Sequence, residues 1–235
     1  MKLGIIGAMS VEIEALKEKL SDMHATRRAG MTFFEGIFEG VPAVLVVCGV
    51  GKVNAAMCAQ VLCDAFQVTH IINTGVAGSL CADLDIGDFV ISTEAIYHDF
   101  TCQVLNPLYV VGQVPGLSTR FFPADARLIE IAYGAAQQVN AGHASKGIVA
   151  SGDQFVCSRE QKAKIVEDTG AVCTEMEGAA IAHTAWRNGI PFVVIRAISD
   201  KADDSAQMDY PTFEAIAAKR STQLTTQLVR SLQTM

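Results

Sequence analysis

The run Pro191-Phe192-Val193-Val194-Ile195-Arg196-Ala197 decides the fold. Its apolar and β-branched residues are nearly continuous rather than alternating, which is typical of a central parallel strand buried on both faces. Strand-like and helix-like segments alternate along the chain before it, with one early hairpin at residues 30–49. We therefore predict an α/β fold, a three-layer α/β/α sandwich around a central mixed, mostly parallel sheet.

Periodicity and turn residues place the other elements. Further strands are expected at residues 2–8, 44–48, 68–74, 87–95, 145–151 and 171–176. Helices are expected at residues 10–20, 54–66, 125–139, 158–168 and 178–186, and from Pro211 onward. Residues 75–79 are expected to form a glycine turn, and residues 100–122 are the least regular segment.

Composition excludes several classes of protein. The 235 residues suffice for one domain over residues 1–235, and half of them are apolar, as in a well-buried enzyme. A net charge of −7 without a basic block argues against a nucleic-acid partner. No apolar run reaches the roughly 18 residues of a membrane span, and the N-terminus does not resemble a signal peptide, so we expect no membrane association.

The cysteines and histidines indicate neither disulfides nor a metal. The seven cysteines are scattered and form no C-x-x-C pair, which is typical of reduced residues in a cytoplasmic protein. The five histidines also lack metal-ligand spacing. Residues 49–53 lack the P-loop spacing, and residues 75–79 lack the dinucleotide fingerprint. We therefore expect neither a P-loop nor a dinucleotide-binding site.

Acidic residues gather where predicted strands end. The stretch TEMEGAA, residues 174–180, places two carboxylates between a strand and a helix. Such acids often only compensate a helix dipole, but strand ends are also where α/β sheets bind ligands. Glu12, the Phe155-Val156 loop and the stretch from Arg196 to Asp200 lie at other strand ends, which favours a ligand site. Phe155 taken alone would more often be a core residue.

These residue types suit a polar, uncharged ligand that carries rings. A sugar diol fits because one carboxylate accepts two hydroxyl hydrogen bonds. A phosphate group would be repelled by Glu12 and Glu177.

The same positions carry a resemblance that spans nearly the whole chain in order. Its stretches are Gly4–Met9 with Glu12, Gly49–Val53, Ile72–Gly78, Tyr97–Asp99, Ser151–Phe155, Glu175–Glu177 and Arg196–Asp200. The chain resembles the 5′-methylthioadenosine/S-adenosylhomocysteine nucleosidases of the purine nucleoside phosphorylase superfamily. The resemblance implies hydrolysis of the bond between adenine and a 5′-thio-substituted ribose, with 5′-deoxyadenosine as a further substrate and no metal or cofactor.

The resemblance also implies a role for each site residue. Glu12 is the base that activates water, and Asp200 is the acid that protonates adenine. Glu177 binds the ribose hydroxyls, Phe155 stacks on the base, and the Val156 backbone reads the edge of the base. The remaining implied substrate-binding residues line the pocket or hold the water and Glu12, and they are Met9, Val50, Gly78, Glu175, Met176, Ser199 and Arg196. Cleavage builds oxocarbenium character that carboxylates stabilise, and adenine needs a proton to leave.

Two other functions are weighed against hydrolysis. A phosphorylase needs cations around its phosphate, and the loop from Met9 to Glu12 supplies an acid and no Arg, which favours water. A non-catalytic nucleoside sensor would keep Glu177 but would not need Glu12 and Asp200 together.

Two features depart from the family pattern. Val76 stands where many relatives carry a Ser that helps to hold the water. The segment from Phe100 to Pro115 also differs, and in the family it reaches the 5′ pocket of the neighbouring subunit. The resemblance therefore implies a homodimer with the 100–115 loop near the neighbouring active site, and it leaves a futalosine-type substrate open.

Overall fold

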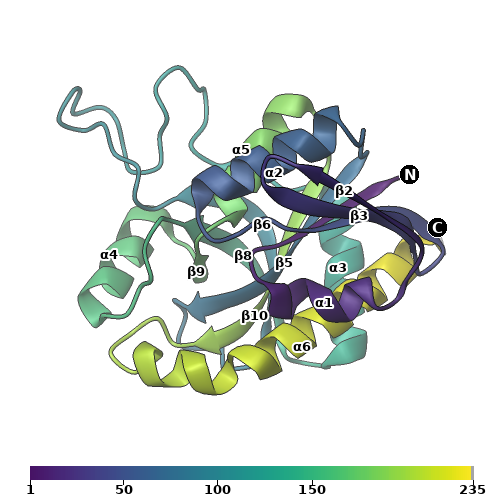
Figure 1. Cartoon of the computed structure of the whole chain (residues 1–235). Helices are drawn as coiled ribbons and strands as arrows, with labels where there is room; N and C mark the ends of the chain where they lie inside the picture. Colours follow the sequence, from purple (N-terminus) through teal and green to yellow (C-terminus); the bar gives the residue numbers. More distant parts are fainter. Residues whose placement is uncertain (234–235) are drawn as a thin grey trace.

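A computed structural model describes residues 1–233 (Figure 1). The strands are β1 (Leu3–Gly7), β2 (Leu20–Arg28), β3 (Met31–Phe38), β4 (Val41–Val47), β5 (His70–Ser79), β6 (Phe89–Tyr97), β7 (Phe122–Pro123), β8 (Ala144–Ser151), β9 (Cys173–Glu175) and β10 (Phe192–Asp200). The helices are α1 (Ser10–Lys17), α2 (Lys52–Asp64), α3 (Ala126–Val139), α4 (Arg159–Thr169), α5 (Gly178–Asn188) and α6 (Ala206–Gln233).

The strands form one mixed sheet, which confirms the predicted α/β fold class. Parallel pairings join β4, β1, β5 and β10 in that order. The hairpin of β3 and β4 is confirmed, and it continues into β2 at the sheet edge. The other end of the sheet closes on itself, because β10 also pairs with β6, and β6, β8 and β9 lead back to β5. This ring of five strands was not predicted.

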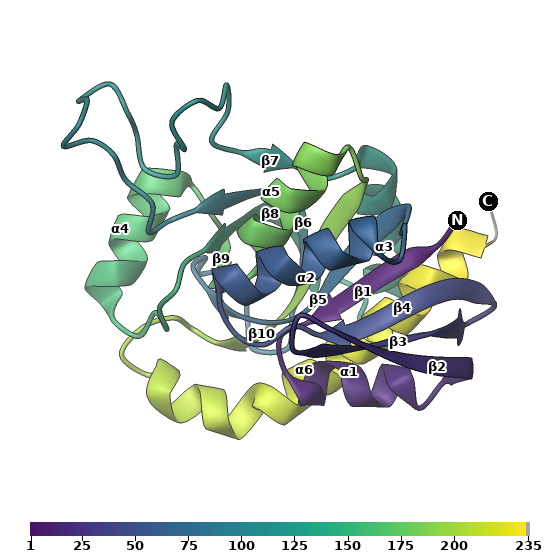
Figure 2. The ribbon, with the colours of Figure 1, turned by 45° about the horizontal axis from the view of Figure 1, so that its top comes forward.

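Helices cover both faces of the sheet (Figure 2). One apolar core lies between the sheet and the pair α2 and α5, and a second lies between the sheet and α1, α3 and α6. Strand β10 contributes to both cores, since Phe192 and Val194 belong to the first and Val193 and Ile195 to the second. All nine of its residues are buried, as the sequence of a central strand predicts.

Two predicted helix boundaries are wrong. Helix α1 ends at Lys17, and Leu20 instead begins strand β2, where it pairs with Phe38. Helix α6 begins at Ala206, so Pro211 lies inside the helix rather than at its start. Pro211 lies past the first turn, so it removes the backbone hydrogen bond that its position would otherwise donate to the residue four earlier.

The predicted glycine turn at residues 75–79 is also wrong. Strand β5 runs straight through these residues to Ser79, and β10 pairs with it as far as Asp200. The two strands therefore extend beyond their apolar runs, and they carry polar side chains to the same end of the ring.

Residues 99–121 contain no helix or strand and project from the body of the molecule at the upper left of Figures 1 and 2. Within residues 1–233, none of the helices has the length and apolar character of a membrane span.

We expect Leu228→Ala to lower the free energy of unfolding by about 2–5 kcal/mol, because Leu228 is fully buried between α6 and the sheet. Ile216→Ala on the same helix is the matched control, since Ile216 is 52% exposed and its loss should change stability by less than about 0.5 kcal/mol. Urea unfolding at one fixed protein concentration measures both. Equal losses for the two variants would show that α6 does not pack as described.

Candidate active site

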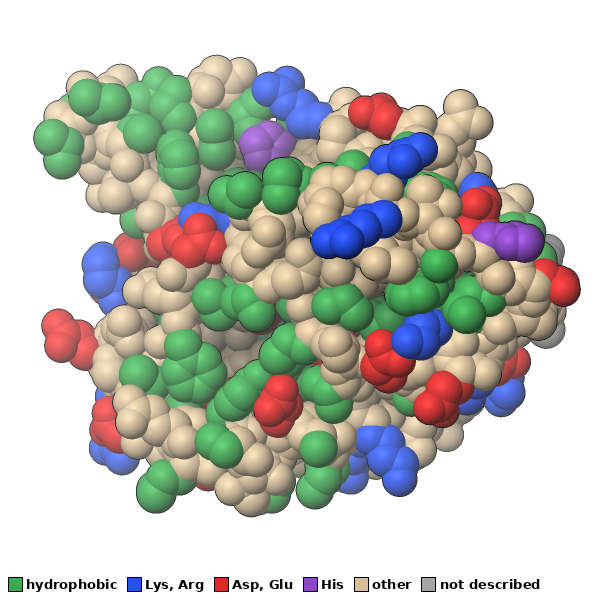
Figure 3. Space-filling model, in the orientation of Figure 1, with side chains coloured by type: hydrophobic (Ala, Val, Ile, Leu, Met, Phe, Trp, Pro, Cys, Tyr) green, Lys and Arg blue, Asp and Glu red, His purple; other side chains and the backbone are tan. Residues whose placement is uncertain are grey.

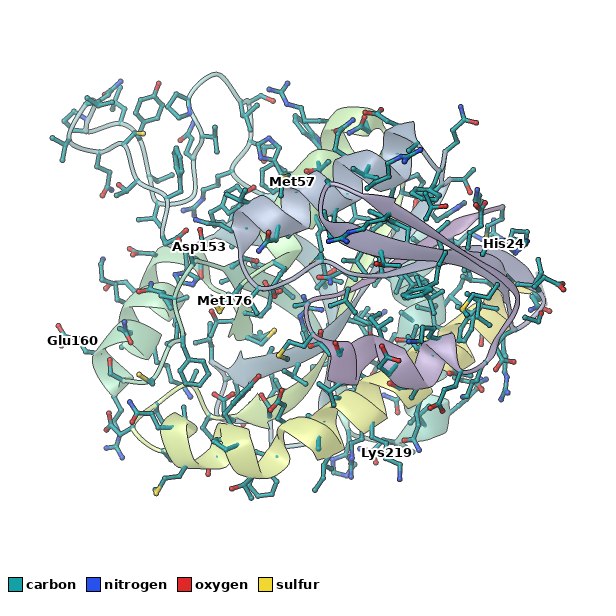
Figure 4. The ribbon with its side chains drawn as sticks, in the orientation of Figure 1. His24, Met57, Asp153, Glu160, Met176 and Lys219 are labelled. Carbon is teal, nitrogen blue, oxygen red and sulfur yellow. The ribbon has the colours of Figure 1, made fainter. Side chains whose placement is uncertain are left out.

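A cavity opens at the end of the ring where β5 and β10 extend, and the space within it and at its open mouth is about 570 Å³. Figure 3 shows a hollow on this face, bordered by hydrophobic side chains, and Figure 4 shows Met176 in the region bordered by α2, α4 and α6. The wall of the cavity consists of Ala8, Met9, Glu12, Val50, Val76, Ala77, Gly78, Gln154, Phe155, Val156, Thr174, Glu175, Met176, Glu177, Ser199, Asp200 and Tyr210. The structure thus brings together every predicted site residue except Arg196.

Glu12 is held rigidly in the wall of this cavity. It is 3% exposed, and its Oε2 accepts hydrogen bonds from the backbone N–H groups of Ala8 (2.6 Å) and Met9 (3.0 Å). Its Oε1 accepts one from the N–H of Val76 at 3.2 Å. Burial raises the pKa of Glu12, although the charge of Arg196 and these hydrogen bonds oppose the shift. The carboxylate is therefore fixed in position and a stronger base than an exposed one.

Asp200 lies at the end of β10 and is 2% exposed. Its Oδ1 accepts a hydrogen bond from the N–H of Ala202 at 2.8 Å, and its Oδ2 accepts one from the hydroxyl of Ser199 at 2.9 Å. Burial raises the pKa of Asp200, against the effect of these two bonds. A raised pKa suits a group that must hold a proton and then release it.

Two glycines of β5 make room for the two acids. A Cβ atom on Gly75 would lie 2.6 Å from Oε1 of Glu12, and one on Gly78 would lie 2.7 Å from Oδ1 of Asp200. Neither glycine has positive φ. They are needed for close approach of a side chain and not for a turn, which explains why the turn prediction failed.

Glu175 and Glu177 have different surroundings although they are two residues apart. The carboxylate of Glu175 accepts hydrogen bonds from the N–H of Gly178 (2.8 Å), the hydroxyl of Ser151 and the guanidinium of Arg196. Among residues 1–233, Glu177 accepts one bond, from the N–H of Gly51 at 2.7 Å. Burial and the neighbouring Glu175 raise the pKa of Glu177 to about 8. Glu177 can therefore still accept hydrogen bonds from a ligand, whereas the carboxylate oxygens of Glu175 are occupied by hydrogen bonds within the protein.

Arg196 is the predicted site residue that does not line the cavity. It lies behind Glu175, outside the cavity wall, and is 2% exposed. Its Nη2 donates to the side chains of Glu175 and Asn73, and its Nη1 donates to the carbonyl of Asn73 at 3.3 Å. Burial opposes its charge, but the surrounding glutamates outweigh that effect and raise the pKa of Arg196. Arg196 thus acts on Glu12 through its charge and makes no hydrogen bond to it.

Tyr210 is a site residue that sequence reasoning missed. It comes from α6, and its ring packs edge-on against Phe155 with centroids 5.4 Å apart. Its hydroxyl donates to the sulfur of Met9 at 3.4 Å. Because α6 was expected to start at Pro211, its first turns were not placed at the cavity. Phe155 is 43% exposed, which leaves an aromatic face available to a ligand.

The pKa of Glu177 predicts a pH dependence of stability. Since its folded value is raised, the folded state holds a proton that the unfolded state releases between about pH 4.5 and pH 8. The contribution of Glu177 to the free energy of unfolding is therefore fully present below pH 4.5, and it is lost as the pH rises toward 8. Relative to Glu177→Gln, the native protein should lose up to about 1.4 kcal/mol per pH unit in that window. Urea unfolding of both proteins from pH 5 to pH 8 measures this, and a constant difference would refute it.

Comparison with known proteins identifies the family. A model described as the phosphorylase superfamily matches residues 2–230. Over 234 residues the chain is 38% identical to the 5′-methylthioadenosine/S-adenosylhomocysteine nucleosidase of Oceanobacillus iheyensis, covering 99% of this chain and 100% of that protein. The Neisseria meningitidis nucleosidase in complex with methylthio-immucillin-A matches with a TM-score of 0.93 and 38% identity, over 98% of this chain and 99% of that one. Futalosine hydrolase of Helicobacter pylori matches with a TM-score of 0.92 and 31% identity, over 97% of each chain. The chain therefore belongs to the phosphorylase superfamily and, within it, to the 5′-methylthioadenosine/S-adenosylhomocysteine nucleosidases.

Proposed function

We propose that this protein hydrolyses the N-glycosidic bond of 5′-methylthioadenosine and S-adenosylhomocysteine, and also of 5′-deoxyadenosine. The products are adenine and the 5′-substituted ribose. The observation that carries the proposal is the pair of buried acids, Glu12 and Asp200, whose pKa values burial raises and which line one cavity. Relatives at 38% identity carry the same activity in their names.

Asp200 is the proton donor in this proposal. Adenine is a poor leaving group as an anion, so an acid must protonate it as the bond breaks. The raised pKa keeps a proton on Asp200 at a higher pH than for an exposed aspartate. The N–H of Ala202 and the hydroxyl of Ser199 hold the carboxyl group in one orientation.

Glu12 is the base that activates water. Its raised pKa increases its affinity for the proton that water gives up, and three backbone N–H groups prevent it from rotating. Charge on the sugar grows as the bond breaks, and a nearby carboxylate stabilises it. An acid on one side and a base on the other follow the logic of an inverting glycosidase.

The other residues of the site bind the substrate or shape the cavity. Glu177 accepts the ribose hydroxyls, Phe155 stacks on adenine, and the Val156 backbone reads its edge. Glu175 positions Glu177 by accepting a hydrogen bond from its backbone N–H, and Arg196, bonded to Glu175, offsets the charge of both glutamates. Further substrate contacts come from Met9, Val50, Gly78, Met176, Ser199 and Tyr210, all of which line the cavity.

The charge of the wall favours water over phosphate as the nucleophile. Within residues 1–233, the cavity wall contains three glutamates and one aspartate, and neither lysine nor arginine. A phosphate there would meet Glu12 and Glu177 without a cation that contacts it. Val76, in the cavity wall with Glu12, has an apolar side chain that cannot bind water. The backbone and Glu12 itself must therefore hold the water.

We also propose a homodimer, which the exposed apolar side chains of the projecting segment support. Val104, Leu105 and Leu108 are 99%, 81% and 85% exposed. Phe100 and Val114 of the same segment line an apolar groove together with Lys52, Val53, Ala56, Tyr97, Asp153, Ala180 and His183. Figure 3 shows hydrophobic side chains on the projection at upper left. A second copy would cover these surfaces and bring the 100–115 loop near its active site. The seven unpaired cysteines fit a cytoplasmic enzyme.

The activity is tested with 5′-methylthioadenosine in phosphate-free buffer, where we expect free adenine. Glu12→Gln and Asp200→Asn should each lower kcat by about 10²–10⁴-fold, because each removes a proton transfer. Glu14→Gln is the matched control, since Glu14 lies on the same helix but points to solvent and pairs with Lys17.

Three results would contradict this proposal. Release of adenine only on addition of phosphate would make the protein a phosphorylase. Turnover of a futalosine-type nucleoside alone would move it to the other matched activity. Full activity in either acid variant would overturn the assigned roles.

Dimer formation is tested by the double substitution Leu105→Asp and Leu108→Asp. Charged side chains in an apolar interface should convert the dimer to monomer in sedimentation velocity at micromolar concentration. Met23→Asp is the control, because Met23 is 48% exposed on edge strand β2 and should leave the dimer intact. A native protein that sediments as a monomer would refute the interface.

A further inference from the structure

Three charged residues join three loops beside the cavity. Lys52 begins α2 after strand β4, Asp99 follows β6, and Asp153 follows β8. The ammonium of Lys52 donates to both oxygens of Asp99 at 2.6 Å, and its backbone N–H donates to Oδ1 of Asp153 at 2.8 Å. The N–H of Asp153 donates to Oδ2 of Asp99 at 2.8 Å. Each residue is thus bonded to the other two, and Figure 4 shows Asp153 beside the first turn of α2.

This cluster is better shielded than an ordinary surface ion pair. The side chains of Lys52 and Asp99 are 22% and 20% exposed. The ammonium also lies 5.5 Å from the ring centroid of Tyr97, over its face. Burial raises the pKa of Asp99, but the bonds from Lys52 and Asp153 outweigh it, so the pKa is lowered. The ion pair is therefore formed at neutral pH and is screened less than an exposed one.

The cluster touches the active site through one glycine. Gly51, at φ +97°, donates its N–H to Oε1 of Glu177 at 2.7 Å. A Cβ atom on Gly51 would lie 3.1 Å from Oδ1 of Asp153, so Asp153 packs directly against this peptide. Lys52 is the next residue, and its backbone N–H donates to that same Oδ1 of Asp153, so Asp153 fixes the Gly51–Lys52 peptide next to the peptide that carries the Gly51 N–H. The direction of the Gly51 N–H is therefore set by the cluster.

We propose that Lys52, Asp99 and Asp153 form a clasp of positioning residues that aims the Gly51 N–H at Glu177 and thereby sets the affinity for the ribose of the substrate. The inference rests on the proposed nucleosidase function. The clasp contacts neither base nor sugar. It orients the backbone donor that Glu177 has within residues 1–233, which favours the ionised form of the carboxylate and turns its second oxygen toward the ligand.

Loss of the clasp should act on KM more than on kcat. We expect Lys52→Met to raise KM for 5′-methylthioadenosine about tenfold, the lower end of the effect of losing a hydrogen bond to a charged group. The change in kcat should stay within about threefold, because Glu12 and Asp200 are bonded elsewhere. Inhibition by adenine, which lacks ribose, should change less than about twofold. Lys52→Arg keeps the charge and should restore most of the affinity.

Lys146→Met is the matched control. Lys146 also donates to both oxygens of an acid, Glu130, at 2.6 Å, but on a surface formed by α3 and β8 outside the cavity. It should leave KM unchanged. If Lys52→Met and Lys146→Met behave alike, the clasp has no role in binding. If adenine binding weakens as much as nucleoside binding, the cluster serves the base instead, which also overturns the proposal.

A second measurement separates the clasp from the proposed activity. The free energy of unfolding is measured across a pH series for the variant Lys52→Met and for the double variant Lys52→Met, Glu177→Gln. The pH dependence of the difference between the two reports the titration of Glu177. Without the Gly51 bond, this titration should move above its native value of about 8. An unchanged midpoint overturns the clasp whatever the turnover. A shifted midpoint in a protein that releases no adenine supports the clasp and overturns the proposed substrate.

Discussion

The buried ion pair between Arg196 and Glu175 is the interaction on which the site depends. Burial of several carboxylates in one place is very unfavourable unless a cation balances them. Arg196 supplies that cation from strand β10, and Glu175 receives it at the end of β9. The same Glu175 accepts the N–H of Gly178 at the start of α5. One pair thus joins two strands of the ring to a helix and makes the nearby acids tolerable.

The position of Arg196 also separates charge balance from ligand binding. Because the guanidinium lies behind Glu175, it lowers the electrostatic cost of Glu12 and Glu177 without offering a donor to the cavity. The acids therefore keep raised pKa values and free acceptor capacity. A guanidinium in the wall itself would ionise the acids fully and would attract anions. The fold achieves a site that is acidic in composition yet able to hold protons.

Much of this could be predicted from the sequence because parallel strands end at the same edge of a sheet. Glu12 and Asp200 follow strand-like runs of the parallel strands β1 and β10, so their convergence follows from the fold class. Phe155 and Glu177 follow β8 and β9, which run antiparallel to that set, and they reach the same cavity because the ring closes. Residues that depend on contacts between distant segments could not be predicted. Tyr210 reaches the cavity only because α6 starts upstream of a proline.

The roles of two glycines in β5 could not be predicted for the same reason. Gly75 and Gly78 lack side chains to admit Glu12 and Asp200, which lie far away in the sequence. Nothing local distinguishes a glycine that permits a turn from one that makes room for a neighbour. The closing of the ring was likewise invisible, since the register between β10 and β6 depends on the curvature of the whole sheet.

The closed ring has a consequence for how the protein is made. Strand β10 is the last to be synthesised, and it closes the ring by pairing with β5 and β6, more than a hundred residues earlier in the chain. Arg196 and Asp200 arrive with it, so a nascent chain has neither the balancing cation nor the second acid. Such long-range pairings slow folding. The buried acids therefore meet only after β10 has been synthesised, and a ribosome-bound fragment that ends before β10 contains the apolar strands but lacks a complete active site.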